Sequence, residues 1–264
     1  MKRAHGVLWL FGLLLLPLLA SAQSPFAGTW KVDMNKVDFS KKPDVYVLQN
    51  GMYQCKTCVP PIDVKADGQD QKVTGHPYYD TIAIKVINDH EIELTNKKDG
   101  KVVATSKTTV SPDGKTEMTE FTDSSNTNGS PVTGKGEAMR VAAGPAGSNA
   151  ISGSWRMSKM ESLSDNAITW TYKVNGEDLT MTSPTGQTYT AKMNGPAAPM
   201  QGDPGITTVS VKSMGKNTLE ETDMRDGKVI GAAKSTVSDD GKTLHIEYAD
   251  KLTGQNMKYV ATKQ

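Results

Sequence analysis

Through most of its length the chain alternates apolar and polar positions with the two-residue period of β-strands. Ile82, Ile84 and Val86 alternate with Ala and Lys, and Ile92 and Leu94 alternate with Glu and Thr in the next segment. Such alternation is typical of strands that bury one face. Beyond the N-terminal apolar run, no stretch of about 12 residues carries the apolar stripe of an amphipathic helix. The pattern therefore predicts an all-β protein.

Turn-forming dipeptides separate these segments. They are Asn50-Gly51, Asp99-Gly100 and Asp113-Gly114 in the first half of the chain, and Asn175-Gly176, Asp226-Gly227 and Asp240-Gly241 in the second. Asn-Gly and Asp-Gly favour tight hairpin turns because both residues accept a positive φ. Short strands joined by such turns predict antiparallel sheets.

The two halves of the chain repeat each other. Residues 75–123 align with residues 202–250 at a constant offset of 127 without a gap, and about 20 of the 49 positions are identical. Self-similarity of this length indicates duplicated structural units. We therefore predict a first repeat over residues 23–143, a linker over residues 144–150 and a second repeat over residues 151–264.

Each repeat has about eight or nine predicted strands, enough to close a small barrel. Closure removes the exposed sheet edges that would otherwise pair with other chains. We therefore predict two tandem antiparallel β-barrels. The alternative is one larger barrel or sandwich to which each repeat contributes half.

The first 22 residues have the pattern of an export signal. Lys2 and Arg3 precede an almost wholly apolar run from Val7 to Leu19, and Ala20-Ser21-Ala22 supplies the small residues of a cleavage site. The apolar run is shorter than the ~20 residues that a membrane-spanning helix needs. We therefore expect a signal peptide over residues 1–22 and an exported mature chain, periplasmic or secreted, without a transmembrane anchor.

The charge balance excludes one class of partner. Lys and Arg number 30 against 29 Asp and Glu, and removal of the signal leaves 28 against 29. Proteins that bind nucleic acid usually have a basic face or stripe. We therefore expect no nucleic-acid partner.

Motifs of common catalytic sites are missing from the sequence. It has no nucleophile elbow, no HExxH metal motif and no glycine loop that would cradle a phosphate. We therefore expect a protein that is not an enzyme and that uses neither a cofactor nor a bound metal.

Both repeats open on a Gly-x-Trp motif, at Gly28-Thr29-Trp30 and Gly153-Ser154-Trp155. These openings resemble the start of lipocalins and other calycins. Over nearly all of both repeats the chain is also similar to a group of uncharacterised exported bacterial proteins with matching Asp-Gly-Lys hairpins. The lipocalin resemblance implies eight-stranded barrels in which the Trp lies at the closed end and an Arg of the last strand packs across it.

Arg140 stands in the matching place in the first repeat. A guanidinium group over an indole ring is a favourable cation–π contact. The second repeat departs from the pattern, because it ends on Lys258-Tyr259-Val260 without such an Arg.

Cys55 and Cys58 are the only cysteines, and the offset of 127 places them on Thr182 and Thr185 of a predicted turn. We therefore expect them to flank a hairpin tip of the first repeat. An exported protein in an oxidising compartment favours a structural disulfide, which is the interpretation we prefer. A redox-active pair, which needs a stabilised thiolate, and a metal site, which usually needs four ligands, are the alternatives.

Aromatic residues are the candidate ligand-binding groups. Trp170 and Tyr172 share one strand face, where they either pack in the core or border a cavity. Tyr78 and Tyr79 lie in the loop over residues 76–80, which either lines a barrel mouth or, as we prefer, only leads into the next strand. The candidate set is completed by the residues of the Gly-x-Trp resemblance, namely Trp30, Trp155 and Arg140.

The lipocalin resemblance and the missing catalytic motifs favour an exported, non-catalytic binding protein whose barrels hold a small, largely apolar ligand. This expectation requires an interior cavity of about 300 Å³ or more. One alternative is an envelope or extracellular interaction protein with filled barrels and an exposed apolar patch. The other is a redox activity centred on Cys55 and Cys58.

Overall fold

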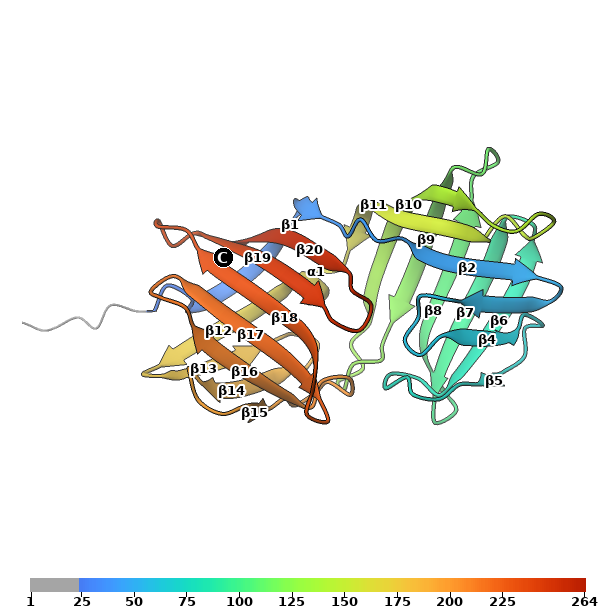
Figure 1. Ribbon diagram of the computed structural model, residues 1–264. Coiled ribbons are helices and arrows are strands. Elements are labelled where there is room, and N and C mark those ends of the chain that lie inside the picture. Colours follow the sequence, from blue (N-terminus) through green and yellow to red (C-terminus); the bar gives the residue numbers. More distant parts are fainter. Residues whose placement is uncertain (1–23) are drawn as a thin grey trace, which may run out of the picture.

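The computed structural model describes residues 24–264 (Figure 1). The predicted signal segment, residues 1–22, lies outside the described residues. The described chain forms two antiparallel sheets of ten strands, each curled into a nearly closed barrel. This confirms the prediction of an all-β fold with two barrels rather than one joint barrel. Among residues 24–264, no helix is long and apolar enough to cross a membrane.

The first barrel consists of strands that follow one another along the chain. They are β2 (Asp44–Gln49), β3 (Met52–Cys55), β4 (Ile62–Lys65), β5 (Gln71–Lys72), β6 (Thr81–Asn88), β7 (Glu91–Lys98), β8 (Lys101–Val110), β9 (Thr116–Asp123), β10 (Val132–Ala143) and β11 (Gly153–Leu163). Their order in the sheet is β4-β3-β2-β11-β10-β9-β8-β7-β6-β5.

The second barrel combines one early strand with the rest of the chain. Its strands are β1 (Gly28–Asp38), β12 (Thr169–Asn175), β13 (Asp178–Thr182), β14 (Thr188–Lys192), β15 (Ala198–Pro199), β16 (Thr208–Ser213), β17 (Thr218–Arg225), β18 (Lys228–Val237), β19 (Thr243–Asp250) and β20 (Asn256–Lys263). Their order is β14-β13-β12-β1-β20-β19-β18-β17-β16-β15, which is the order of the first barrel with equivalent strands.

The first strand of each repeat lies in the barrel of the other repeat. β1 pairs with β12 and β20, whereas β11 pairs with β10 and β2. The sheets therefore do not follow the predicted repeat boundaries at residues 143 and 151. Only the short connection over residues 144–152 separates β10 from β11. Because strands that are consecutive in the chain usually pair, β11 takes the place beside β10 that β1 would otherwise occupy.

Two short connections carry the chain between the barrels. Residues 39–43 join β1 to β2, and residues 164–168, which include the helix α1 (Asp165–Ile168), join β11 to β12. In Figure 1 the barrels lie end to end, with the β2–β3 and β12–β13 hairpin tips at opposite ends of the molecule. We call the ends that face each other the open ends of the barrels.

Hairpin turns occur where the dipeptides predict them. Asn50 and Asp99 have φ angles of 52° and 50°, and the Gly after each has a φ of 73° and 76°. Asp226 and Gly227 repeat this geometry at 50° and 77°. Two successive residues with positive φ are what a type I′ hairpin turn requires. The hairpins β2–β3, β7–β8 and β17–β18 are thereby confirmed.

Each barrel has more strands than the eight or nine counted from the sequence. The additional strands include β5 and β15, which have only two residues each and pair with a single neighbour. Such short segments show no two-residue alternation, so periodicity does not reveal them. The fold is compatible with lipocalin-like architecture, although the sheets differ from the eight-stranded barrel that the resemblance implies.

The Trp of each Gly-x-Trp motif is buried in the core of one barrel. Trp30 in the second barrel and Trp155 in the first are 0% and 1% exposed. Each indole N–H donates to a carbonyl four residues earlier, that of Phe26 at 2.8 Å and that of Ile151 at 2.9 Å. A cation covers each ring: the Arg140 guanidinium carbon lies 4.0 Å from the Trp155 ring centroid, and Lys263 Nζ lies 4.8 Å from that of Trp30.

The Arg–Trp contact implied by the resemblance therefore joins different residues from those expected. Arg140 covers Trp155 of the second repeat rather than Trp30 of its own repeat, because β11 has replaced β1 beside β10. Lys263 takes the equivalent place in the second barrel, where the sequence shows no Arg. Its ammonium group also donates to the carbonyls of Pro25 and Ala27, at 3.0 and 2.8 Å. Arg140 likewise donates to the carbonyls of Ser152 and Ala150, at 2.5 and 2.6 Å, so in both barrels one cation contacts the Trp ring and backbone carbonyls.

Candidate functional site: a cavity in the second barrel

The second barrel contains a cavity of about 340 Å³. It lies toward the open end, between the start of β12 and the ends of β17 and β19. The walls include the aromatic rings of Trp170, Tyr172, Tyr248 and Tyr259, the thioethers of Met181 and Met200, and the carboxyl groups of Asp203, Glu221 and Asp223. Neutral polar side chains, among them Ser183, Thr185 and Gln187, and aliphatic side chains complete the lining. The cavity opens broadly to solvent, and inward-facing side chains of the barrel form its inner wall.

Two of the carboxyl groups come from one strand face. Glu221 and Asp223 are two residues apart on β17, so both point into the barrel. Glu221 accepts a hydrogen bond from the Tyr189 hydroxyl at 2.5 Å. Asp223 is 7% exposed, and its Oδ1 has no hydrogen-bond partner among the described residues. An acceptor buried in this way is available to a ligand.

Burial raises the pKa of both carboxyl groups. Proximity of Asp223 raises the pKa of Glu221 further, while the hydrogen bond from Tyr189 acts in the opposite direction. The neighbouring charge of Asp203 adds to the effect of burial on the pKa of Asp223. The physical cause in each case is that a charged carboxylate loses hydration and faces another negative charge.

A glycine makes room for these groups. A Cβ atom at Gly231 of β18 would lie 2.5 Å from the Tyr248 hydroxyl oxygen and 3.1 Å from Asp223 Oδ2. The first distance is shorter than any real contact of a Cβ atom. The same position in the first repeat is Ala104, so only the second repeat has a glycine here.

Trp170 offers the cavity an unused donor. Its Nε1 is buried and has no acceptor within the described part of the chain. The ring packs edge-on against Tyr172, with centroids 6.2 Å apart and an interplanar angle of 80°. A buried N–H group without an acceptor costs about 1–3 kcal/mol. The cavity thus presents both a free donor and a free acceptor.

Contacts with the first barrel border the mouth of the cavity. The Tyr78 hydroxyl donates to Asp203 Oδ1 at 2.8 Å, and this oxygen also accepts two backbone N–H groups of the turn after Asp203. A Cβ atom at Gly205 would lie 2.2 Å from the Tyr78 hydroxyl oxygen, so Tyr78 occupies the space that this glycine leaves. Asn128 donates to the carbonyl of Pro184 at 2.8 Å. The open ends of the two barrels therefore meet at this mouth.

The structure separates the predicted ligand-binding residues into three groups. Trp170 and Tyr172 line the cavity, and Tyr78 contacts its rim through Asp203. Tyr79 instead stacks on His76 within the first barrel, with ring centroids 4.8 Å apart. Trp30, Trp155 and Arg140 do not line the cavity, although Trp30 lies directly opposite Trp170 in the pairing of β1 with β12.

Sequence patterning does not single out Glu221 and Asp223. Carboxylates are frequent in this chain, and period-two alternation places many of them on solvated strand faces. The available signal lies in the repeat, because the offset of 127 aligns these residues with Leu94 and Asn96. The feature that marks the site is the replacement of Leu94, an apolar residue of the first repeat, by Glu221 on the inward face of the equivalent strand.

The first barrel has different chemistry in its interior. Leu94, Tyr79 and Cys58 pack against its hydrophobic core. Glu117 of β9 is 7% exposed, and its Oε2 has no partner among the residues described. Burial raises the pKa of Glu117 to about 7, although the positive charge of Arg140 acts to lower it. The offset of 127 aligns Glu117 with Leu244, which is fully buried in the second barrel.

The expected disulfide joins Cys55 and Cys58, with a Cα–Cα distance of 5.5 Å. Cys55 is the last residue of β3 and is 2% exposed, and Cys58 lies in the connection to β4. The two cysteines thus flank the tip between consecutive strands, as the repeat predicts.

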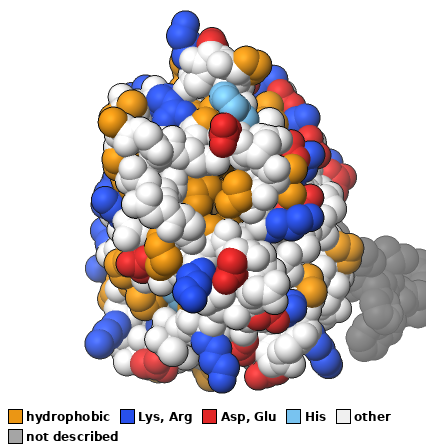
Figure 2. Space-filling model, turned by 90° about the vertical axis from the view of Figure 1, so that its right-hand side faces the viewer, with side chains coloured by type: hydrophobic (Ala, Val, Ile, Leu, Met, Phe, Trp, Pro, Cys, Tyr) orange, Lys and Arg blue, Asp and Glu red, His pale blue; other side chains and the backbone are white. Residues whose placement is uncertain are grey.

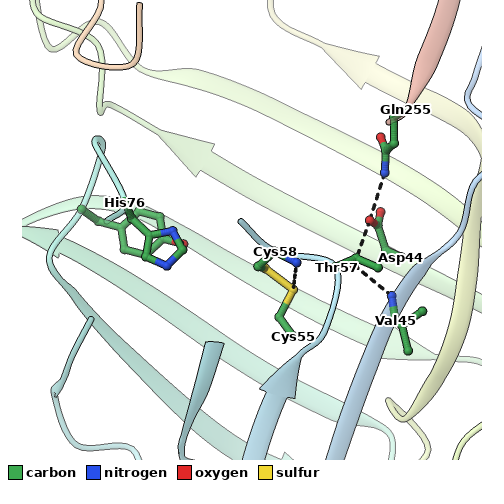
Figure 3. Close-up of a disulfide and its surroundings, with 8 residues drawn as sticks. Asp44, Val45, Cys55, Thr57, Cys58, His76 and Gln255 are labelled. Carbon is green, nitrogen blue, oxygen red and sulfur yellow. Dashed lines mark hydrogen bonds between the residues drawn. A yellow bond between two sulfur atoms is a disulfide. The ribbon is translucent and has the colours of Figure 1, made fainter. Parts of the chain in front are cut away.

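The disulfide loop stands at the contact between the barrels (Figure 3). Within this loop, the Thr57 hydroxyl donates to Asp44 Oδ1 at 3.3 Å and accepts the backbone N–H of Val45 at 3.1 Å. Asp44 Oδ1 also accepts the side-chain amide of Gln255, which belongs to the second barrel, at 3.0 Å. The bridged loop therefore positions a side chain that helps to hold the two barrels together.

Between residues 24 and 264, no group of three or more His, Cys, Asp or Glu side chains is arranged to hold a metal ion. The expectation that the protein uses no cofactor stays a prediction.

The outer end of the first barrel gives no separate candidate site. Figure 2, which shows the right-hand end of the molecule in Figure 1, has charges of both signs scattered around a small hydrophobic area near its centre. An interaction surface usually needs a contiguous apolar patch of several hundred Å². The hypothesis of an interaction protein stays a prediction.

Comparisons with known proteins provide no assignment for this chain. No family model matches it, and no curated protein matches it significantly. Any functional conclusion must therefore come from the geometry and chemistry of the cavity.

Proposed function

We propose that this protein is an exported, non-catalytic binding protein that holds a small ligand in the cavity of the second barrel. The observation that supports the proposal is the cavity volume of about 340 Å³. Small-molecule sites start at roughly 300 Å³ and combine apolar walls with a few well-placed polar groups. The aromatic and Met side chains supply such walls, and Trp170 and Asp223 supply unused polar atoms.

Export is supported by two independent features. The N-terminal residues follow the pattern of a signal peptide. The bonded cysteine pair suits an oxidising compartment, where structural disulfides persist.

A redox role for the cysteines has less support. A reactive cysteine usually sits in a partly exposed, electropositive setting. Cys55 is 2% exposed and packs in the core of the first barrel, and only Cys58 is partly exposed. The bridged loop instead supports contact between the barrels through Thr57 and Asp44.

A pair of matched substitutions tests the binding function. Ala233 of β18 lines the cavity, and its neighbour Ala232 points to the outer face of the same strand. Ala233→Phe should therefore fill the cavity, while Ala232→Phe should leave it open. With the neutral apolar fluorophore phenylnaphthylamine, we expect binding by the wild type and by Ala232→Phe, and a loss of about tenfold or more in affinity for Ala233→Phe.

Thermal melting of both variants shows whether each is folded at the temperature of the titration. Equal binding of the fluorophore by the two folded variants, or no binding by the wild type, would overturn the proposed site.

A further inference from the structure

We propose that the cavity of the second barrel selects organic cations, in the form of a protonated amine joined to an aromatic body. This inference rests on the proposed binding function and specifies its ligand class. The observations behind it are the acidic lining, the unpartnered oxygen of Asp223 and the ring of aromatic side chains.

The described lining of the cavity contains acidic side chains and no Lys, Arg or His. Asp203 Oδ1 already accepts three hydrogen bonds, from Tyr78 and from two backbone N–H groups. Glu221 has one donor, Tyr189, and Asp223 Oδ1 has none in the described part of the chain. Carboxylates removed from water need an opposite charge or hydrogen-bond donors, and an ammonium group supplies both.

The spacing of the two carboxyl groups suits a single ammonium group. Residues two apart on a strand project from the same face, about 6–7 Å apart along it. A protonated primary amine has three N–H donors, so it can bond to Asp223 Oδ1 and to Glu221 from one position. These bonds are charge-assisted and therefore stronger than bonds between neutral groups.

The remaining walls suit an aromatic body. Trp170, Tyr172, Tyr248 and Tyr259 line the cavity, and the faces of such rings attract cations and stack on other rings. An anion of the same shape would meet Glu221 and Asp223 without a compensating positive charge. The cavity is therefore expected to discriminate against carboxylate ligands.

The first barrel shows that the acidic pair is not required by the fold. Leu94 and Asn96 occupy the positions of Glu221 and Asp223, on a strand with the same pairing and the same following turn. The pair is thus a property of one barrel, and the exposed Glu220 on the outward face of β17 offers a matched control.

Three ligands with one indole ring and different side-chain charge test the proposal. Tryptamine carries an ammonium group, tryptophol carries a hydroxyl group in its place, and indoleacetate carries a carboxylate. In competition with phenylnaphthylamine, we expect tryptamine to bind about tenfold or more tightly than tryptophol, and indoleacetate to bind most weakly.

Neutral substitutions identify the groups responsible. Asp223→Asn and Glu221→Gln should each reduce the preference for tryptamine over tryptophol to about threefold or less, whereas Glu220→Gln should keep it. The affinity of each variant for phenylnaphthylamine shows whether its cavity is intact.

The outcomes separate this inference from the proposed function. Equal affinities of the wild type for tryptamine and tryptophol, with the fluorophore still bound, would overturn the cation selectivity and leave the binding function standing. A preference for tryptamine that survives in both neutral variants would also overturn it. Failure of the wild type to bind the fluorophore or any indole would remove both proposals.

Discussion

The two barrels have the same strand order and the same buried Trp residues but differ at the ends that face each other. In the second barrel, the turn over residues 183–187 borders a cavity with two inward-facing carboxyl groups, those of Glu221 and Asp223. In the first barrel, the equivalent tip is closed by the Cys55–Cys58 disulfide, and Tyr79 packs against the core. The features common to both barrels maintain the fold, so the features found in only one are those to test for function.

A second difference concerns continuity along the chain. The first barrel is a single segment from Asp44 to Leu163, whereas the second needs β1 from the beginning of the chain. Each barrel therefore contains the first strand of the other repeat. As a result, a substitution in the first repeat can act on the second barrel, and the reverse also holds.

The largest expected effect tests this exchange. Trp30→Ala and Trp155→Ala should each destabilise the protein by about 3–5 kcal/mol, since each removes a fully buried aromatic ring. In hydrogen exchange, the backbone amides of β12 and β20 should lose protection in Trp30→Ala, and those of β10 and β2 should lose protection in Trp155→Ala. Loss of protection in β2 and β10 for Trp30→Ala would contradict the exchanged pairing.

Glu117→Gln tests a buried carboxyl group of the first barrel that has no counterpart at the equivalent position of the second, which is Leu244. The folded protein holds the Glu117 proton up to a pKa of about 7, while the unfolded chain releases it near its ordinary value of 4.5. The wild type should therefore lose stability as the pH rises between these values, and the Gln variant should not. At about 1.4 kcal/mol per pKa unit, the difference between 4.5 and about 7 should give the variant a gain of about 3 kcal/mol relative to the wild type by pH 8.

Urea unfolding at several pH values measures this difference. Glu120→Gln, on the outward face of the same strand, is the control and should show no such dependence. A constant gap between Glu117→Gln and the wild type across the pH range would contradict the prediction.

Removal of the disulfide tests what closes the tip in the first barrel. The double substitution Cys55→Ser and Cys58→Ser should lower stability by about 2 kcal/mol, because a short loop loses its covalent constraint. Fluorophore binding in the second barrel should be unchanged, since neither cysteine lines that cavity. Loss of binding in the folded double variant would show that the two open ends depend on each other.

The smallest effect is expected at the contact between the barrels. Tyr78→Phe removes the hydroxyl that bonds to Asp203 and should cost about 1 kcal/mol. Tyr79→Phe is a matched control within the first barrel, where the hydroxyl lies 3.3 Å from His76 Nδ1. Faster release of the fluorophore, measured by stopped flow, is expected for Tyr78→Phe only. Equal release rates for both variants would contradict a role of this contact at the mouth.

Local chemistry accounts for what the sequence by itself determined. The alternation around Ile82 and Ile92 places strands, the Asn-Gly and Asp-Gly dipeptides place hairpins, and the repeat identifies two similar units. The position of the cysteines at a turn follows from the same alignment. These features depend on neighbours in the chain, which the sequence shows directly.

Only the tertiary structure decided which strand completes which barrel and what the interior contains. The motif around Trp30 and that around Trp155 are equivalent in sequence, so local patterning does not distinguish the two ways of placing β1 and β11. Which of the two strands pairs with β10 depends on the short connection between β10 and β11 and on the closure of each barrel. Barrel closure brings together residues that are far apart in the sequence. The cavity depends on the same closure, because Glu221, Asp223 and Trp170 meet only when β12 and β17 belong to one wall.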